Sequence, residues 1–156
     1  MRKLFLVFAL LFCMVSYSNA QDYNTGIGFR GGLSNGLTIK TFIGEKAALE
    51  FLVASRWHGF SLTGLYEIHN QAFNADGLKW YYGVGVHVGF WNGKHVKWAD
   101  DDVAYTVIGF DGILGLEYSF PDIPINISID WKPELNVSGY SGFWGDGGAI
   151  SIRYIF

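Results

Sequence analysis

Eight segments of this 156-residue chain alternate, residue by residue, between an apolar side chain and a small or polar one. Such a period of two places successive side chains on opposite faces of a β-strand. The segment lengths are close to the roughly 9–11 residues of a tilted transmembrane strand. The predicted strands are residues 23–33, 37–43, 47–57, 60–68, 80–90, 108–120, 125–131 and 150–156.

The face opposite the apolar one carries few charged residues, and its acidic and basic residues are equal in number. It carries glycines, such as Gly83 and Gly85 beside His87, and few other residues between its charges. The five acidic residues on this face are Glu50, Glu67, Asp111, Glu117 and Asp130, and the five basic residues are Arg30, Lys40, Arg56, Lys132 and Arg153. The lumen of a narrow eight-stranded barrel requires this composition, because bulk does not fit there and a buried charge needs a partner.

The low charge content favours a barrel whose outer wall faces lipid. Only 16% of the residues are charged, against roughly 25% in ordinary soluble domains. A soluble barrel or sandwich remains the alternative, but its polar face would be crowded with Lys, Glu and Thr. We therefore predict an all-β fold, a closed antiparallel up-and-down transmembrane β-barrel of eight strands, with His87 and the ten charges in its lumen.

The first twenty residues have the layout of a signal peptide. Arg2 and Lys3 precede an apolar run, and Ser18 and Ala20 offer small residues for cleavage. Cys13 would be the modified residue of a rival lipoprotein signal, but the bulky Phe12 precedes it. We expect a barrel domain at 21–156 with a formal net charge of −5 and no cysteine.

Aromatic residues of the apolar face gather at strand ends, as expected for belts at the two membrane surfaces. One belt comprises Trp57, Phe60, Phe90 and Trp131, and the other comprises Trp80, Tyr82, Tyr118, Phe120, Tyr154 and Phe156. Residues 121–124 form a short turn, whereas 92–104 and 133–147 are predicted to be long outer loops.

The last ten residues, GGAISIRYIF, resemble the C-terminal strand of bacterial outer-membrane barrels. The pattern of the whole mature chain is similar to that of small, eight-stranded outer-membrane barrels of the Bacteroidota type. This resemblance implies that the insertion machinery reads Tyr154 and Phe156. It implies a location in the outer membrane of a Gram-negative cell envelope, but no activity, because such barrels serve as structural proteins, adhesins, porin-like pores and enzymes.

The sequence contains no convincing arrangement of catalytic residues. We therefore predict that the protein is not an enzyme and has no cofactor or metal site. His58 and Ser61 have the wrong spacing for the His-x-Ser motif of deacylase barrels, and His69 and His95 are expected to be solvated. The run 100–102 of three aspartates is interpreted as a solvated loop. Tyr140, Phe143 and Trp144 are candidates for outer-loop contacts.

These features predict a monomeric, non-enzymatic outer-membrane protein with a plugged lumen and a structural or surface-interaction role. Its expected partners are membrane lipid, the insertion machinery and an unidentified extracellular ligand. A nucleic-acid partner is not expected, because the chain is acidic. The alternatives are a lipid-modifying acyl hydrolase or transferase and a narrow pore for small solutes.

Overall fold

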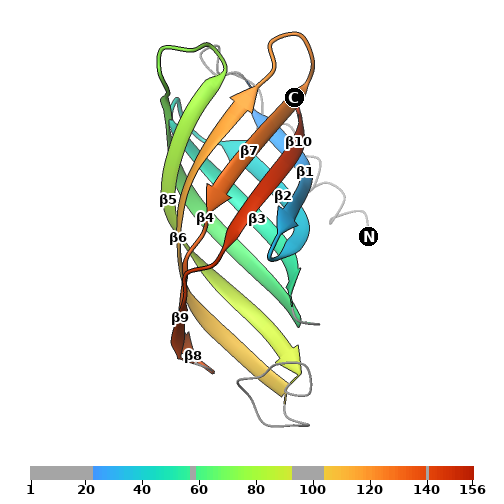
Figure 1. The fold of residues 1–156 in the computed structure, drawn as a ribbon, viewed down its shortest axis with the longest axis vertical. Coiled ribbons are helices and arrows are strands. Elements are labelled where there is room, and N and C mark those ends of the chain that lie inside the picture. The colour runs from blue at the N-terminus through green and yellow to red at the C-terminus, as the bar shows by residue number, and fades with distance from the viewer. Residues whose placement is uncertain (1–22, 57–58, 93–103, 140) are drawn as a thin grey trace, which may run out of the picture.

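The computed structural model describes residues 23–56, 59–92, 104–139 and 141–156, which form an antiparallel β-structure (Figure 1). Ten strands follow one another along these residues: β1 (Thr25–Gly32), β2 (Asn35–Phe42), β3 (Ala47–Arg56), β4 (Gly59–Gln71), β5 (Leu78–Asn92), β6 (Ala104–Ser119), β7 (Ile125–Trp131), β8 (Glu134–Ser138), β9 (Gly142–Trp144) and β10 (Gly148–Ile155). Within the same residues, no helix is long and apolar enough to cross a membrane.

Eight of these strands close into a barrel, which confirms the predicted architecture. Each of β1 to β6 pairs antiparallel with the strand that follows it, and β10 pairs with both β1 and β7. Closure gives each of these strands a hydrogen-bonded neighbour on both sides, so little unpaired edge is left. The connections 43–46, 72–77 and 120–124 define the turn end of the barrel, and the opposite end is called the loop end.

Alternation along each strand separates an apolar outside from a polar inside. In β10, Ile150, Ile152 and Tyr154 are 54%, 54% and 60% exposed, whereas Ser151 and Arg153 between them are fully buried. The same change of environment at every step runs through β7, and through β1 as far as Gly31. The interior of this barrel is therefore mainly polar, and most of its large apolar side chains face outward.

The predicted long loop at 133–147 is wrong in part, because it contains β8 and β9. Pro133 has no N–H to donate to a ladder, and β7 ends at Trp131, two residues before it. The chain then pairs again with β6, from Glu134 opposite Asp111, with a register shift between Ile108 and Gly109. β9 pairs in turn with β8.

The wall is higher on one side of the barrel than on the other. β5 and β6 have 15 and 16 residues, whereas β1 and β2 have 8 each. The long strands, together with β8 and β9, extend past the short ones at the loop end, which is the lower end in Figure 1.

Tyr23 corrects the prediction for the first strand. The alternation assigns it to the outer face with Ile27 and Phe29, but it is only 5% exposed. It lies before β1 begins, so the period of the strand does not reach it. Its hydroxyl donates into the lumen to Glu117, at 3.3 Å from Oε2.

Candidate functional site

The lumen holds ten of the eleven residues that the alternation assigns to it, none more than 5% exposed: Arg30, Lys40, Glu50, Glu67, His87, Asp111, Glu117, Asp130, Lys132 and Arg153. Arg56 is the exception. It is the last residue of β3 and is only half-buried. The ten form a cluster near the turn end, one isolated pair, and a cluster nearer the loop end.

The turn-end cluster comprises Lys40, Glu50, Glu67, Glu117 and Arg153. The Lys40 ammonium lies 2.8 Å from Glu67, 3.3 Å from Glu117 and 3.6 Å from Glu50. It also lies 3.9 Å from the centre of the Tyr81 ring, a cation–π contact. Charges removed from water in this way are stable only with partners of opposite sign.

Arg153 connects four strands through its guanidinium. It pairs with Glu50 on β3. It also donates to Ser128 at 2.8 Å, Asn126 at 3.2 Å and Thr38 at 3.2 Å, on β7 and β2. A planar group with five donors suits such a site, where several acceptors converge from different directions.

The same cluster contains more carboxylates than cations. Glu50, Glu67 and Glu117 face Lys40 and Arg153, and all five side chains are fully excluded from solvent. Neither oxygen of Glu67 accepts a hydrogen bond within the described residues, so its contact with Lys40 is an ion pair alone. Glu67 is therefore the least satisfied of the three carboxylates.

His69 is buried, whereas the sequence predicts that it is solvated near a turn. It is 2% exposed and stacks on Tyr81, with ring centroids 4.9 Å apart. Its Nε2 is 3.6 Å from both Glu67 and Glu117. The reason is that β4 continues to Gln71, which keeps His69 on the inward face of a strand.

A separate bidentate pair joins β1 to β7. The two terminal nitrogens of Arg30 donate to the two oxygens of Asp130, one of them at 2.6 Å. The Tyr81 hydroxyl donates to the same carboxylate at 3.3 Å. Parallel hydrogen bonds of this kind are among the strongest that charged side chains form.

The loop-end cluster comprises His87, Asp111, Lys132, Glu134 and Asn136. The two ring nitrogens of His87 lie 2.9 Å from Asp111 and 2.9 Å from Asn136. Lys132 donates to Asp111 at 2.8 Å and to Glu134 at 2.6 Å. Glu134 and Asn136 belong to β8, in the segment predicted as a loop, which is why the sequence did not place them here.

Three members of this cluster have the geometry of metal ligands. Ligand atoms of His87, Asp111 and Glu134 lie within 4.8 Å of one another. However, the ammonium of Lys132 already bridges the two carboxylates. A metal ion would therefore have to displace a bound cation, and the arrangement is better described as an ion cluster held together by Lys132.

Near the loop end, Trp91 is buried inside the barrel and Arg56 forms an ion pair with Asp146. The indole of Trp91 lies directly on Gly59 and Gly89, where a Cβ would come within 2.1 Å of the ring. Arg56 pairs with Asp146 at 2.6 Å, and this hydrogen bond holds the pKa of Asp146 below its usual value. The Asp146 side chain is 55% exposed, so water screens the pair.

The remaining predicted residues lie at the two ends of the molecule. Phe143 is 65% exposed on β9, and Trp144 makes an edge contact with Trp91, with centroids 5.7 Å apart. Tyr154 and Phe156 point outward at the turn end. Tyr140, His58, His95, the aspartates 100–102 and the segment 1–20 lie outside the described residues.

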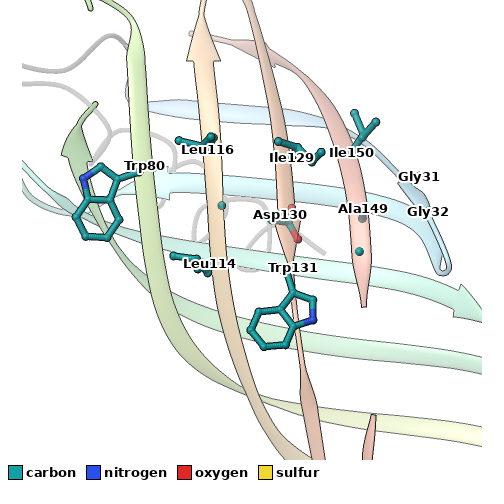
Figure 2. A pocket seen from close by; sticks show the side chains of 12 residues that line it. Gly31, Gly32, Trp80, Leu114, Leu116, Ile129, Asp130, Trp131, Ala149 and Ile150 are labelled. Carbon is teal, nitrogen blue, oxygen red and sulfur yellow. The ribbon is translucent and has the colours of Figure 1, made fainter. Parts of the chain in front are cut away.

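The outer wall carries an apolar groove of about 730 Å³, here called the outer groove (Figure 2). It lies between two rows of outward side chains on β5, β6, β7, β10 and β1. One row is Trp80, Leu116, Ile129, Ile150 and Gly31, and the other is Leu114, Trp131 and Gly148. The floor between the rows consists of Gly115, Asp130, Ala149 and Gly32. The groove does not follow from the sequence pattern, since it depends on which strands become neighbours.

Comparison with known proteins adds no relative. The chain matches no family model, no curated protein and no solved structure.

Proposed function

We propose that this chain is an integral outer-membrane β-barrel with a plugged polar lumen, and that it acts through its surface rather than by catalysis. One observation carries the proposal, which is the inverted polarity of the fold. Among the described residues, eighteen polar or charged residues are buried against eleven hydrophobic ones, and thirty-two large hydrophobic side chains are exposed. A soluble monomer rarely exposes contiguous apolar patches above a few hundred Å².

Aromatic pairs at both ends of the wall support a position in the membrane. Phe60 and Phe90 stack near the loop end, with centroids 5.9 Å apart. Near the turn end, Trp80 stacks on Tyr82 at 5.4 Å. Aromatic rings favour the two interfaces between hydrocarbon and water, so two belts fit one bilayer.

The contacts inside the lumen support a plugged barrel. Ion pairs cross it from β2 to β6 and from β10 to β3, and Trp91 is buried inside it near the loop end. A path for solutes would require several of these buried pairs to separate, and breaking one such pair costs about 3–5 kcal/mol. We therefore propose that the resting barrel does not conduct.

Export and assembly complete the proposal. Residues 1–20 would direct export, and Tyr154 and Phe156 would be read by the insertion machinery. The exposed Phe143 and its neighbours on the β8–β9 side would contact an extracellular ligand. The barrel would work as a monomer.

Heat-modifiable migration on a gel tests the membrane proposal. The full chain, expressed in a Gram-negative host, should fractionate with the outer membrane and resist carbonate extraction. Unboiled protein should migrate faster than boiled protein, because a closed barrel stays folded in detergent. A mature chain that stays soluble without detergent would overturn the proposal. A steady conductance in planar bilayers would replace the plugged barrel with a narrow pore, and acyl release from lipid would replace it with an enzyme.

A further inference from the structure

We propose that the outer groove holds one acyl chain of a membrane lipid in a defined position on the wall. This inference rests on the proposed function, since it requires the outward face to lie in a bilayer. It goes further in naming a particular site and ligand on that face. The groove is continuous with the surrounding belt of exposed Leu, Ile and Val side chains, so the medium that covers the belt also enters the groove.

The length of the groove is compatible with the depth of one leaflet. Its longer row crosses five neighbouring strands, from Trp80 near the turn end of β5 to Gly31 near the loop end of β1 (Figure 2). Four strand spacings of about 4.8 Å give about 19 Å. With strands tilted about 45°, this line projects about 13 Å onto the membrane normal, against about 15 Å for the hydrocarbon of one leaflet.

The lining chemistry fits hydrocarbon rather than a polar ligand. Asp130 is the one charged residue among the twelve that line the groove. Its carboxylate is turned into the lumen, where Arg30 and Tyr81 bind it. The floor strands are paired with one another by register, so their backbone groups are satisfied within the sheet. The carboxylate of Asp130 and the indole N–H of Trp131 in this lining are thus both bound within the protein.

Two tryptophans make the walls rigid before a lipid arrives. Trp131 donates its indole N–H to the Gly145 carbonyl at 2.7 Å, and Trp80 stacks on Tyr82. Inside a bilayer there is no hydrophobic gain from covering apolar surface, so selective retention must come from shape and dispersion contacts. A preformed groove supplies these contacts, whereas a flat wall does not.

Two glycines keep the groove open at its loop end, and substituting them would fill the groove. A Cβ built at Gly148 meets no atom within 4 Å, and one built at Gly31 meets only Asn35, at 3.7 Å. Neither glycine has a positive φ. Gly148→Phe and Gly31→Leu should therefore occupy the groove without disturbing the fold. Gly64→Phe is the matched control, since Gly64 is another outward glycine with only ordinary contact to Phe51.

Photo-crosslinking tests the site. The full chain would be inserted into phosphatidylethanolamine–phosphatidylglycerol vesicles that contain a phospholipid with a diazirine on its acyl chain. Irradiation and peptide mapping should then give severalfold more adduct on Leu114, Ile129 and Ile150 than on Val84 and Val86, which are also outward. Gly148→Phe should remove this excess, whereas Gly64→Phe should leave it unchanged.

The outcomes separate the groove from the proposed function. Uniform labelling around the wall, or an excess that survives in Gly148→Phe, would overturn the lipid site while leaving the membrane barrel intact. Crosslinked dimers joined through the groove would replace the lipid with a second copy of the chain. Failure to insert into vesicles at all would overturn the proposed function itself.

Discussion

Two arginines at opposite ends of the barrel show how closure of the wall changes the contribution of an ion pair to stability. Arg153 and its partner Glu50 are both fully excluded from solvent, whereas Arg56 and its partner Asp146 are 13% and 55% exposed. Arg153 lies between paired strands on both sides, but the β3–β4 ladder ends at Arg56. An arginine–carboxylate pair therefore contributes much to stability inside the closed wall and little at its rim.

The largest expected effect is that of Arg153→Met. It leaves the Glu50 carboxylate without its guanidinium partner and removes donors from Thr38, Asn126 and Ser128. We expect a loss of about 3–5 kcal/mol in the free energy of unfolding. Urea unfolding in vesicles, followed by tryptophan fluorescence, measures it. Arg56→Met is the control, and equal losses for the two variants would contradict the comparison.

A second prediction separates two carboxylates of the turn-end cluster. Glu50→Gln removes the charge that Arg153 and Thr38 bind, so we expect a loss of about 2–3 kcal/mol. Glu67→Gln should cost less than about 1 kcal/mol, because Glu67 accepts no hydrogen bond from the residues that the structure describes and three carboxylates face two cations there. The same unfolding experiment compares the two, and a larger loss for Glu67→Gln would show that the surplus charge has an additional partner.

A third prediction concerns Trp91 at the loop-end mouth. Gly59→Ala places a methyl group against the indole, which must move away from Arg56. We expect a loss of about 1–3 kcal/mol, as for other overpacked sites, and a shift of the tryptophan emission. Gly148→Ala, where a Cβ has open space, should change neither. An unchanged emission in Gly59→Ala would mean that the Trp91 indole does not pack on Gly59.

The smallest effect is expected for Asp146→Asn, at most about 1 kcal/mol at neutral pH. The folded pKa of Asp146 lies below its unfolded value, so the pair adds stability above about pH 4 and loses it as the pH falls through the folded pKa. Unfolding measured from pH 7 down to pH 2 should therefore show wild type and variant converging in acid. A gap that persists in acid would assign the effect to something other than this carboxylate.

The sequence predicted the direction of side chains well wherever a strand runs undisturbed. Glu117 and Ser151 face inward and Ile152 outward because period two leaves no other choice once one face is known. The prediction from sequence failed where a residue lies outside the regular alternation of a strand. Tyr23 precedes its strand, His69 lies in the extension of β4 beyond the predicted end, and Pro133 interrupts a wall that resumes in β8.

The alternation, the scarcity of charge and the aromatic strand ends thus determined by themselves an eight-stranded barrel with an apolar outside, because side-chain direction in a strand is a local property. Partners were decided only by the tertiary structure. Arg153 meets Glu50 across 103 residues, and the outer groove forms where β5 and β1 lie four strands apart on one curved wall. Strand register and barrel closure set these contacts, and neither follows from the alternation within any single segment.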